Sequence, residues 1–397
     1  MKLRLLDFLV CPIDRTPLDL VEWESRPLKL GSEDTARMER LRLDRERFSR
    51  EVMTGVLLNR NRRILYPIYQ GVPRMLSFST GVAREFGKRY GQRIDREFPG
   101  YTLPQVPPMP GEGTVLRTFS SEWVNYDWDG KAFWNMRPDV HYESLKFLLD
   151  TAHHPVKDKL VLEVGIGIGG MADHMARSEQ CEMIGIDLSH AVDAAQRHFG
   201  NNPFFHIIQA SAFAVPLPEN TFDLVYSHGV IHHTFSTKTA FDRICRLPKV
   251  RGRLYVWVYS PYNEKRTLMR RALMTLENLV RPLCWRLPER LQTVVLAPLL
   301  PLYIMHQNFH VKRGGPGYVS YGWREALHAA RDRFTPRYVH RHSEEEVRRW
   351  FQNAGYVSAD DSGKREYPDF VPADFVWNTA VSGVRQSLRI PDHANAA

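Results

Sequence analysis

Three glycines and one carboxylate have the spacing of a nucleotide-type binding site. Gly165, Gly167 and Gly169 follow a short β-branched run, and the next residues continue at helical spacing. Strand, glycine-rich turn and helix stand in the order that such a site requires, because only glycine lets the backbone approach a ligand so closely. A second strand, 181–187, ends in Asp187, whose side chain is placed to accept hydrogen bonds from both hydroxyls of a ribose.

The position of the third glycine distinguishes between cofactors. A dinucleotide site favours G-x-G-x-x-G, because a pyrophosphate must rest on the helix N-terminus. Here the pattern is Glu163-x-Gly-x-Gly-x-Gly169, with an acid ahead of the first glycine. This pattern resembles motif I of the class I methyltransferases. The resemblance implies that the cofactor is S-adenosylmethionine rather than NAD.

Three further blocks resemble, in the same order, the methyltransferases related to ubiquinone and menaquinone biosynthesis. Residues 215–233 are similar to the stretch that leads into their fourth strand, 251–260 to their fifth strand, and 342–356 to the helix before their sixth strand. The similarity runs from about 155 to 385. It implies an α/β fold with a Rossmann-like, seven-stranded, doubly wound sheet.

The resemblance also implies which residues contact the cofactor. They are Glu163, Gly165, Gly167, Gly169, Asp187, Leu188, Ser211, Ala212, Ser227 and His228. In the family an aspartate usually meets the adenine amino group, but in this chain that position is Ser211. The serine must bind through its hydroxyl, or leave the contact to the backbone of Ala212.

Methyl transfer from a sulfonium is an in-line displacement of an already activated methyl group. The enzyme has mainly to hold the nucleophile about 3 Å from the methyl carbon in a dry pocket, and a base helps only where the acceptor loses a proton. His232 and His233 follow the expected fourth strand, at the edge where ligands bind in open α/β sheets. A neutral imidazole can remove a proton from a hydroxyl or an amine. These two histidines are therefore the candidate base, the alternative being that one of them only orients the loop.

Four side chains are candidates for the pocket of the methyl acceptor. They are Trp134, Tyr142, Tyr259 and His310. Tyr259 ends the expected fifth strand, whereas Trp134 and Tyr142 belong to an aromatic-dense segment that either closes over the site or forms ordinary core. His310 lies in a long connection of the kind that often carries a substrate lid.

The connection 261–340 is predicted to form a helical cap. A basic amphipathic helix, 269–290, precedes the strongly apolar stretch 291–305. One interpretation is a peripheral membrane contact or a pocket for an apolar acceptor. The other is a cap packed on the core, favoured because Pro298 and Pro301 interrupt a long lipid-facing helix.

The excess positive charge is concentrated in the same connection. The whole chain has a net charge of +9, and residues 261–313 hold nine Lys or Arg against three Glu. Such a stretch can attract nucleic acid, an anionic lipid surface or an acidic small molecule, and it can also be only a solvated face.

Residues 1–80 are expected to form a separate α+β domain. The segments 5–14, 56–59 and 66–76 resemble the zinc-ribbon-like domain known as the activating subunit of several tRNA, rRNA and protein methyltransferases. Many such domains bind zinc through Cys-Pro-x-Cys, but here the second position is Asp14 and no later cysteine pair exists. We expect the fold without the metal, as a docking or stabilising domain.

The composition is that of a soluble globular protein of several domains. Among 397 residues, 43% are hydrophobic and 25% charged, and no run reaches the about 18 apolar residues that a membrane-spanning helix needs. The four cysteines stand singly, so we expect neither disulfide nor metal, and a cytoplasmic location. The expected divisions are 1–80, a linker with cap helices at 81–150, the cofactor half of the core at 151–260, the cap at 261–340, and the end of the core at 341–390.

The sequence therefore predicts a methyltransferase acting on a small molecule at oxygen, nitrogen or carbon. The acceptor would be a secondary metabolite, a glycan precursor or a lipid-like intermediate. One alternative is an RNA methyltransferase, because residues 232–237 and the N-terminal domain resemble the tRNA wobble-uridine methyltransferases and the basic stretch suits phosphates. Against it, the stretch lacks interleaved aromatic and basic residues. Another alternative is a non-catalytic scaffold, and the oligomeric state is left open.

Overall fold

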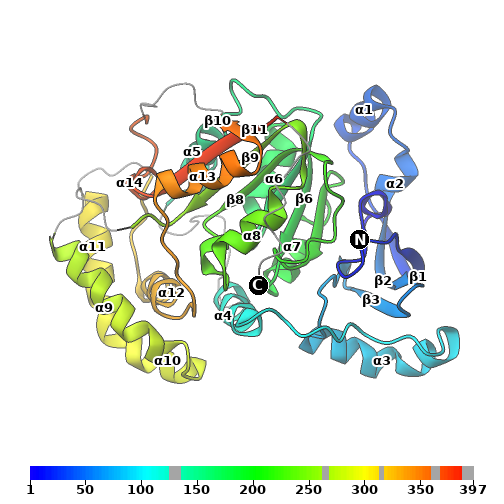
Figure 1. Cartoon of the computed structure of the whole chain (residues 1–397), viewed down its shortest axis with the longest axis horizontal. Helices are drawn as coiled ribbons and strands as arrows, with labels where there is room; N and C mark the ends of the chain where they lie inside the picture. Colours follow the sequence, from blue (N-terminus) through cyan, green and yellow to red (C-terminus); the bar gives the residue numbers. More distant parts are fainter. Residues whose placement is uncertain (125–135, 262–267, 313–316, 359–366, 387–397) are drawn as a thin grey trace.

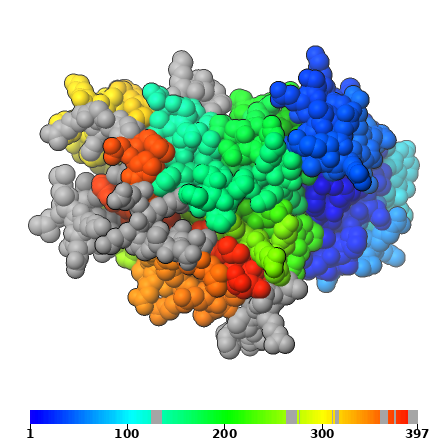
Figure 2. Space-filling model, turned by 90° about the horizontal axis from the view of Figure 1, so that it is seen from above, coloured from blue at the N-terminus to red at the C-terminus, as the bar shows by residue number. Residues whose placement is uncertain are grey.

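The computed structural model describes residues 1–124, 136–261, 268–312, 317–358 and 367–386. An N-terminal sheet domain lies at one end, a central sheet covered by helices on both faces lies in the middle, and a helical cap lies at the other end (Figure 1). Figure 2 shows the N-terminal domain, in blue, seated directly against the core.

The central sheet has the strand order β10-β11-β9-β8-β5-β6-β7. Its strands are β5 (Leu160–Val164), β6 (Glu182–Asp187), β7 (Phe205–Gln209), β8 (Phe222–His228), β9 (Pro248–Val258), β10 (Tyr356–Ser358) and β11 (Thr379–Arg385). Neighbours from β9 to β7 are parallel, and β11 is antiparallel to β9 and β10. The chain order reverses between β5 and β8, which is where open α/β sheets bind ligands. The predicted seven-stranded, Rossmann-like sheet is confirmed.

Helices cover both faces of this sheet, which is why its strands are apolar along almost their whole length. The covering helices are α5 (Pro138–Leu149), α6 (Gly170–Ser178), α7 (Ala191–Phe199), α8 (Thr237–Ile244) and α13 (Glu344–Asn353). Along β5, Val161 packs in the apolar cluster that contains α5, α6 and α7, whereas Leu162 and Val164 pack in the cluster that contains α8 and α13. The glycine turn at the end of β5 is thus held between two packed layers.

The N-terminal domain is a four-stranded antiparallel sheet in the order β1-β2-β3-β4. Its elements are η1 (Leu3–Asp7), β1 (Asp19–Pro27), α1 (Ser32–Leu41), α2 (Arg45–Ser49), β2 (Arg50–Asn59), β3 (Ile64–Tyr69) and β4 (Val72–Pro73). Strands β3 and β4 pair antiparallel across a tight turn at Gly71, whose φ is +81°.

The segment after β4 differs from the linker that the sequence suggested. Residues Gly81–Glu97 form helix α3, which begins where the Thr80 side chain accepts a hydrogen bond from the amide of Ala83 at 3.2 Å. Phe86 and Ile94 of this helix pack against the N-terminal sheet. The polar outer face of α3 dominates its composition, so the segment looked like solvent-exposed linker although its apolar face is buried.

A short backbone contact joins the N-terminal domain to the edge of the central sheet. The amide of Met75 donates to the carbonyl of Gln209, at the end of β7, at 2.8 Å. The buried guanidinium of Arg74 donates to the Gln209 side chain at 3.2 Å and to Asp193 at 2.5 Å. The two domains therefore share hydrogen bonds as well as apolar contacts.

The cap is made of four main helices with an apolar core of their own. They are α9 (Leu268–Cys284), α10 (Glu289–Leu296), α11 (Leu300–Lys312) and α12 (Trp323–Phe334), with the short η3 (Ala297–Leu299) at the proline-rich break. Cys284, Leu296, Leu300, Ala330 and Phe334 form its buried centre. Among the residues that the structure describes, no helix combines the length and apolar character needed to cross a bilayer.

Two further helices complete the molecule. Helix α4 (Glu112–Val124) packs against α7 of the core and α12 of the cap, so it bridges the two units. The short α14 (Ala373–Val376) precedes β11. Short 3-10 geometry also occurs after β8, at η2 (Ile231–His233).

One buried carboxylate links the N-terminal domain to β6 and gives a testable pH dependence. Glu182 accepts hydrogen bonds from Arg4 at 2.9 Å and from His206 at 3.0 Å. Burial alone would raise the pKa of Glu182, but the hydrogen bonds from His206 and Arg4 lower it to about 2 from 4.5.

We predict that Glu182→Gln lowers the free energy of unfolding at pH 7 by about 1.5–3 kcal/mol, the range for hydrogen bonds to charged groups. Because the folded pKa is lowered, this stabilisation is present above pH 4.5 and is lost as the pH falls towards 2. Denaturant unfolding at pH 7 and pH 3 should therefore show a smaller pH dependence in the variant. Glu345→Gln, at an exposed side chain, is the matched control, and equal pH dependence in all three proteins would contradict the prediction.

Candidate functional site

The turn after β5 adopts a backbone conformation that requires glycine. Gly165 has a φ of +91°, and a Cβ built there would lie 2.3 Å from a methyl carbon of Val230. Gly167 has a φ of +52°, and a Cβ there would lie 3.1 Å from the Trp123 ring. A side chain at either position would strain the backbone and fill the space beside it. Gly169 caps the N-terminus of α6 and does not line the cavity described below.

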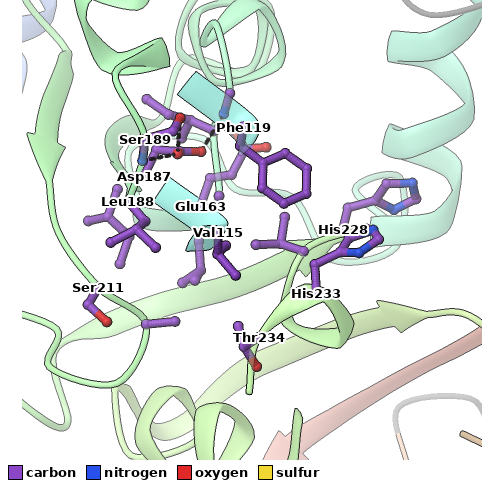
Figure 3. Close-up of a pocket in the computed structure, with 18 of the residues that line it drawn as sticks. Val115, Phe119, Glu163, Asp187, Leu188, Ser189, Ser211, His228, His233 and Thr234 are labelled. Carbon is purple, nitrogen blue, oxygen red and sulfur yellow. Dashed lines mark hydrogen bonds between the residues drawn. The ribbon is translucent and has the colours of Figure 1, made fainter. Parts of the chain in front are cut away.

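Asp187 ties the glycine turn to the end of β6. One carboxylate oxygen accepts the amide of Gly167 at 2.9 Å, and the other accepts the amide and the hydroxyl of Ser189 at 2.8 and 2.7 Å (Figure 3). Burial raises the pKa of Asp187, and the Ser189 and Gly167 donors oppose that shift. The carboxylate borders a cavity, as a ribose-binding acid would have to.

That first cavity has a volume of about 160 Å³ and lies over the ends of β5, β6 and β7. Its floor contains eight of the ten cofactor contacts that the sequence implied: Glu163, Gly165, Gly167, Asp187, Leu188, Ser211, Ala212 and His228. Ser227 is the second exception after Gly169, because it is fully buried and its hydroxyl donates to the carbonyl of Val164 at 3.2 Å. Leu188 and Ser211 lie on one side of the cavity and His228 and His233 on the other (Figure 3).

The roof of the first cavity comes from α4, which the sequence did not connect to the site. Glu112, Val115, Phe119 and Trp123 of this helix line the cavity. The Glu112 Oε2 accepts the amide of Met109 at 2.9 Å, whereas its Oε1 is buried without a hydrogen-bond partner of normal geometry among the described residues. Burial raises the pKa of Glu112, and the neighbouring Ser211 hydroxyl opposes the shift.

The carboxyl group of Glu163 lies at the bottom of the same cavity. Its Oε2 accepts the hydroxyl of Tyr226 at 2.8 Å. Burial, reinforced by the charge of Asp187, raises the pKa of Glu163 to about 8, although the Tyr226 hydrogen bond opposes the shift. A carboxyl with such a pKa takes up a proton at neutral pH unless a cation binds beside it.

A second cavity of about 340 Å³ lies between the sheet edge and the cap. The two cavities share a wall made of His141, His228, Gly229, His233 and Asp332. Beyond that wall the second cavity is lined by aromatic residues of the core, by Glu277 and Arg281 of α9, and by Tyr303 of α11. Ligands bound in the two cavities would therefore meet at this shared group of side chains.

The two candidate base histidines occupy different environments. His232 is fully buried and lines neither cavity, and its ring packs against the rings of His233 and Tyr259 at centroid distances of 4.1 Å. His233 lines both cavities, and its Nδ1 lies 3.0 Å from the carbonyl of Tyr338. Burial lowers the pKa of His233 to about 4, so its ring is neutral at pH 7.

The histidines of the shared wall are neutral as well. Burial lowers the pKa of His228 to about 3, and the charge of His141 acts in the same direction. The His228 ring stacks on Trp257 with 4.7 Å between centroids. Burial also lowers the pKa of His141 to about 3. The histidines of the wall at which the cavities meet therefore carry no positive charge at pH 7.

Of the four residues expected in the acceptor pocket, one lines a cavity, one does not, and two have side chains outside the described residues. Tyr259 lines the second cavity. Tyr142 lines neither cavity and stacks on His174 at 4.2 Å, while the preceding residue of α5, His141, faces both. Consecutive residues of an α-helix are rotated by about 100° around its axis. The His141 side chain therefore faces the cavities, whereas the Tyr142 side chain packs against the core. Trp134 lies outside the described residues.

The last candidate, His310, belongs to α11, but its side chain lies outside the described part of the chain. One turn earlier in the same helix, His306 lines the second cavity. The sequence also missed Asp332 of α12, which lines both cavities. Burial raises the pKa of Asp332 to about 6, and the charge of Arg333 opposes the shift. Nothing in the local sequence around Asp332 distinguishes it from a solvent-exposed helical acid.

The N-terminal domain holds hydrogen bonds where related domains bind zinc. Asp14 accepts the hydroxyl of Thr16 at 2.7 Å and the amide of Asn59 at 2.9 Å. Cys11 is buried and lies 3.2 Å from the hydroxyl of Tyr66. Within the described residues, no group of three or more His, Cys, Asp and Glu side chains could hold a metal ion.

Comparisons with known proteins find two family matches, each to one segment of this chain. Residues 162–256 match the family described as a methyltransferase domain, and residues 2–71 match the family described as Trm112p-like protein. The resemblances noted in the sequence are confirmed for both segments.

Individual relatives match parts of the chain. A phosphoethanolamine N-methyltransferase of Arabidopsis thaliana is 33% identical over 101 residues, which cover 25% of this chain and 21% of that protein. A sterol 24-C-methyltransferase of Eremothecium gossypii is 25% identical over 173 residues, which cover 40% of this chain and 45% of that protein. The chain thus spans less than half of the length of these curated relatives.

Among solved structures, a magnesium protoporphyrin IX methyltransferase from Synechocystis with bound S-adenosylhomocysteine superposes with a TM-score of 0.41 at 15% identity. The superposition covers 69% of this chain and 99% of that one.

Proposed function

Because the chain carries a methyltransferase domain, we propose that it transfers the methyl group of S-adenosylmethionine to a small-molecule acceptor. The observation that carries this proposal is the pair of cavities that meet at one wall. The cofactor binds in the first cavity and the acceptor in the second. The sulfonium methyl then lies at the wall of His141, His228 and Asp332, which both ligands reach.

The charge of the first cavity supports this cofactor. Four carboxyl groups, those of Glu112, Glu163, Asp187 and Asp332, line it. Burial raises the pKa of each of these groups. A cation bound beside them would lower these pKa values and favour the ionised carboxylates. S-adenosylmethionine carries two cations, a sulfonium and an ammonium, and a cavity rich in buried acids suits both.

The direction of the cofactor follows from the shared wall. Its reactive sulfur must lie beside the second cavity, at His228, so the adenine must lie at the opposite side, near Leu188 and Ser211 (Figure 3). The ribose between them reaches Asp187. In-line displacement then needs the acceptor atom on the far side of the methyl carbon, inside the second cavity, where the cap excludes water.

The names of the relatives indicate which acceptor atoms such enzymes can methylate. Their names describe methylation of phosphoethanolamine at nitrogen and of a sterol at carbon. A neutral amine can attack and lose its proton afterwards, whereas a hydroxyl must lose its proton during transfer. We infer that Asp332 accepts this proton, with His233 as the second candidate. His232 acts indirectly, by packing on His233 and Tyr259.

Direct binding and transfer test the proposal. Isothermal titration with S-adenosylhomocysteine should give heat with the wild type, and Asp187→Ala should weaken binding at least about tenfold because a ribose contact and the turn anchor are both lost. Asp242→Ala, at an exposed ion pair with Lys238, should bind like the wild type. Labelled methyl from S-adenosylmethionine should enter small molecules of a cell extract. Absence of binding by the wild type would contradict the proposal, and label in total tRNA alone would favour an RNA substrate.

Glu112 supplies the acid that the sequence lacks at Ser211. We propose that its Oε1 accepts a hydrogen bond from the amino group of the adenine, since Glu112 and Ser211 are neighbours in the lining of the cavity. A carboxylate discriminates between bases by its inability to donate. It favours an amino group and disfavours the carbonyl of a hypoxanthine ring.

We therefore predict that the wild type binds S-adenosylhomocysteine at least about tenfold more tightly than S-inosylhomocysteine, and that Glu112→Gln narrows or reverses this ratio. A glutamine can donate to the hypoxanthine carbonyl as well as accept. Titration of both ligands measures the ratio. Glu122→Gln, at a buried acid of the same helix that does not line the cavity, should keep the wild-type ratio. An unchanged ratio in Glu112→Gln would refute the assignment.

The role of Asp332 is tested by its pH profile. Since its pKa is raised to about 6 and the ionised form accepts the proton, kcat should rise between about pH 5 and 7. Asp332→Asn should lower kcat by about 10²–10⁴-fold and remove that rise. If Asp332→Asn loses activity but kcat still rises over the same pH range, another group accepts the proton. His233→Gln is then the next variant to test.

A further inference from the structure

Two acids, Glu277 and Asp332, and three arginines line the second cavity. The arginines are Arg281 of α9, Arg333 of α12, and Arg341, which follows α12. Arg333 forms an ion pair with Glu277 at 3.0 Å. Arg281 forms no ion pair with any carboxylate of the described residues, although just 8% of its surface is exposed.

The hydrogen bonds of Arg281 leave one end of its guanidinium unused. Its Nε donates to the carbonyl of Arg333 at 3.1 Å and its Nη1 to the side chain of Asn278 at 2.9 Å. For Nη2, the described part of the chain offers no hydrogen-bond partner. The side chain is therefore fixed by two neutral acceptors, with a charged donor left over at a cavity wall.

Such a group is costly unless a ligand compensates it. A buried guanidinium loses its hydration, and burial accordingly lowers the pKa of Arg281. The charge of Glu277 opposes this shift, whereas the charge of Arg341 adds to it, so the two guanidinium groups lie near each other. Proteins keep two cations together around a cavity where an anion binds between them.

Arg341 is also held in place at this cavity. Its guanidinium carbon lies 5.5 Å from the centre of the Tyr259 ring, and its Nη1 is 3.5 Å from the carbonyl of Ser260. The Tyr259 ring packs in turn against the rings of His232 and His233. The arginine pair thus lies on the cap side of the cavity, and an aromatic surface leads from it towards the shared wall.

We propose that the methyl acceptor carries an anionic group, a carboxylate or a phosphate, that binds Arg281 and Arg341 while the atom to be methylated faces the shared wall. This inference rests on the proposed function. It concerns a small molecule, because an arginine that is buried under the cap cannot reach the backbone phosphates of a folded RNA outside the cavity. The apolar part of the acceptor lies along Tyr259 and the neighbouring aromatic residues.

Matched small probes test the charge requirement without knowledge of the natural acceptor. The full-length protein is saturated with S-adenosylhomocysteine, and binding of phenyl phosphate, benzoate and the neutral benzyl alcohol is measured by ligand-observed NMR. At least one of the anions should bind about tenfold more tightly than the alcohol, a difference of about 1.4 kcal/mol. Comparison of phenyl phosphate with benzoate tells which anion the acceptor carries.

Variants locate the effect at Arg281. Arg281→Met should abolish the preference for the anion, and Arg281→Lys should keep part of it, because the charge remains but the paired donors are lost. Arg286→Met removes an exposed arginine that follows the same helix and should retain the full preference. Each variant must bind S-adenosylhomocysteine as the wild type does, which establishes that its fold is intact.

The outcomes separate this inference from the proposed function. If the wild type does not bind S-adenosylhomocysteine, the proposed function fails. If it binds that ligand but binds neither anion better than benzyl alcohol, or if Arg281→Met keeps the preference, the anionic acceptor is refuted. In a cell extract, the labelled methyl product should be retained on an anion-exchange resin, and a product that passes through unretained would overturn the inference.

Discussion

The hydrogen bonds accepted by Asp187 hold the geometry of the site. One of its oxygens binds the amide of Gly167 and the other binds Ser189, so a single side chain fixes the turn after β5 relative to the loop after β6. Because the carboxylate is buried and saturated with donors on its inner side, its remaining acceptor capacity faces the cavity.

Strand order then determines what the cavity can contain. Since β8 lies beside β5, the residue at its end, His228, borders the same space as the glycine turn. Helices α4 and α12 close that space from above, and they belong to segments far apart in the sequence. The meeting of two cavities at one wall thus depends on the sheet and on the cap together, and neither unit alone would form it.

Sequence patterns predicted the part of the site that one short segment encodes. The glycine turn and Asp187 could be found because backbone conformation restricts the residue types there. Glu112, Asp332 and Arg281 could not be found, because they stand in ordinary amphipathic helices and become buried only through tertiary packing. The prediction that Tyr142 lines the pocket failed for a related reason, since six of the twelve residues of α5 are buried and the pattern does not define which of them meets the cavity.

The junction of the N-terminal domain with β7 has a thermodynamic consequence. Arg74 and Met75 donate hydrogen bonds to Gln209, two residues before Ser211, which lines the first cavity. Where such domains are separate proteins, this contact would dissociate on dilution. Here a peptide chain joins the two sides, so their effective concentration is set by the tether and is independent of the amount of protein present. The bracing of β7 is therefore a permanent property of the polypeptide and cannot be titrated by competition for a shared subunit.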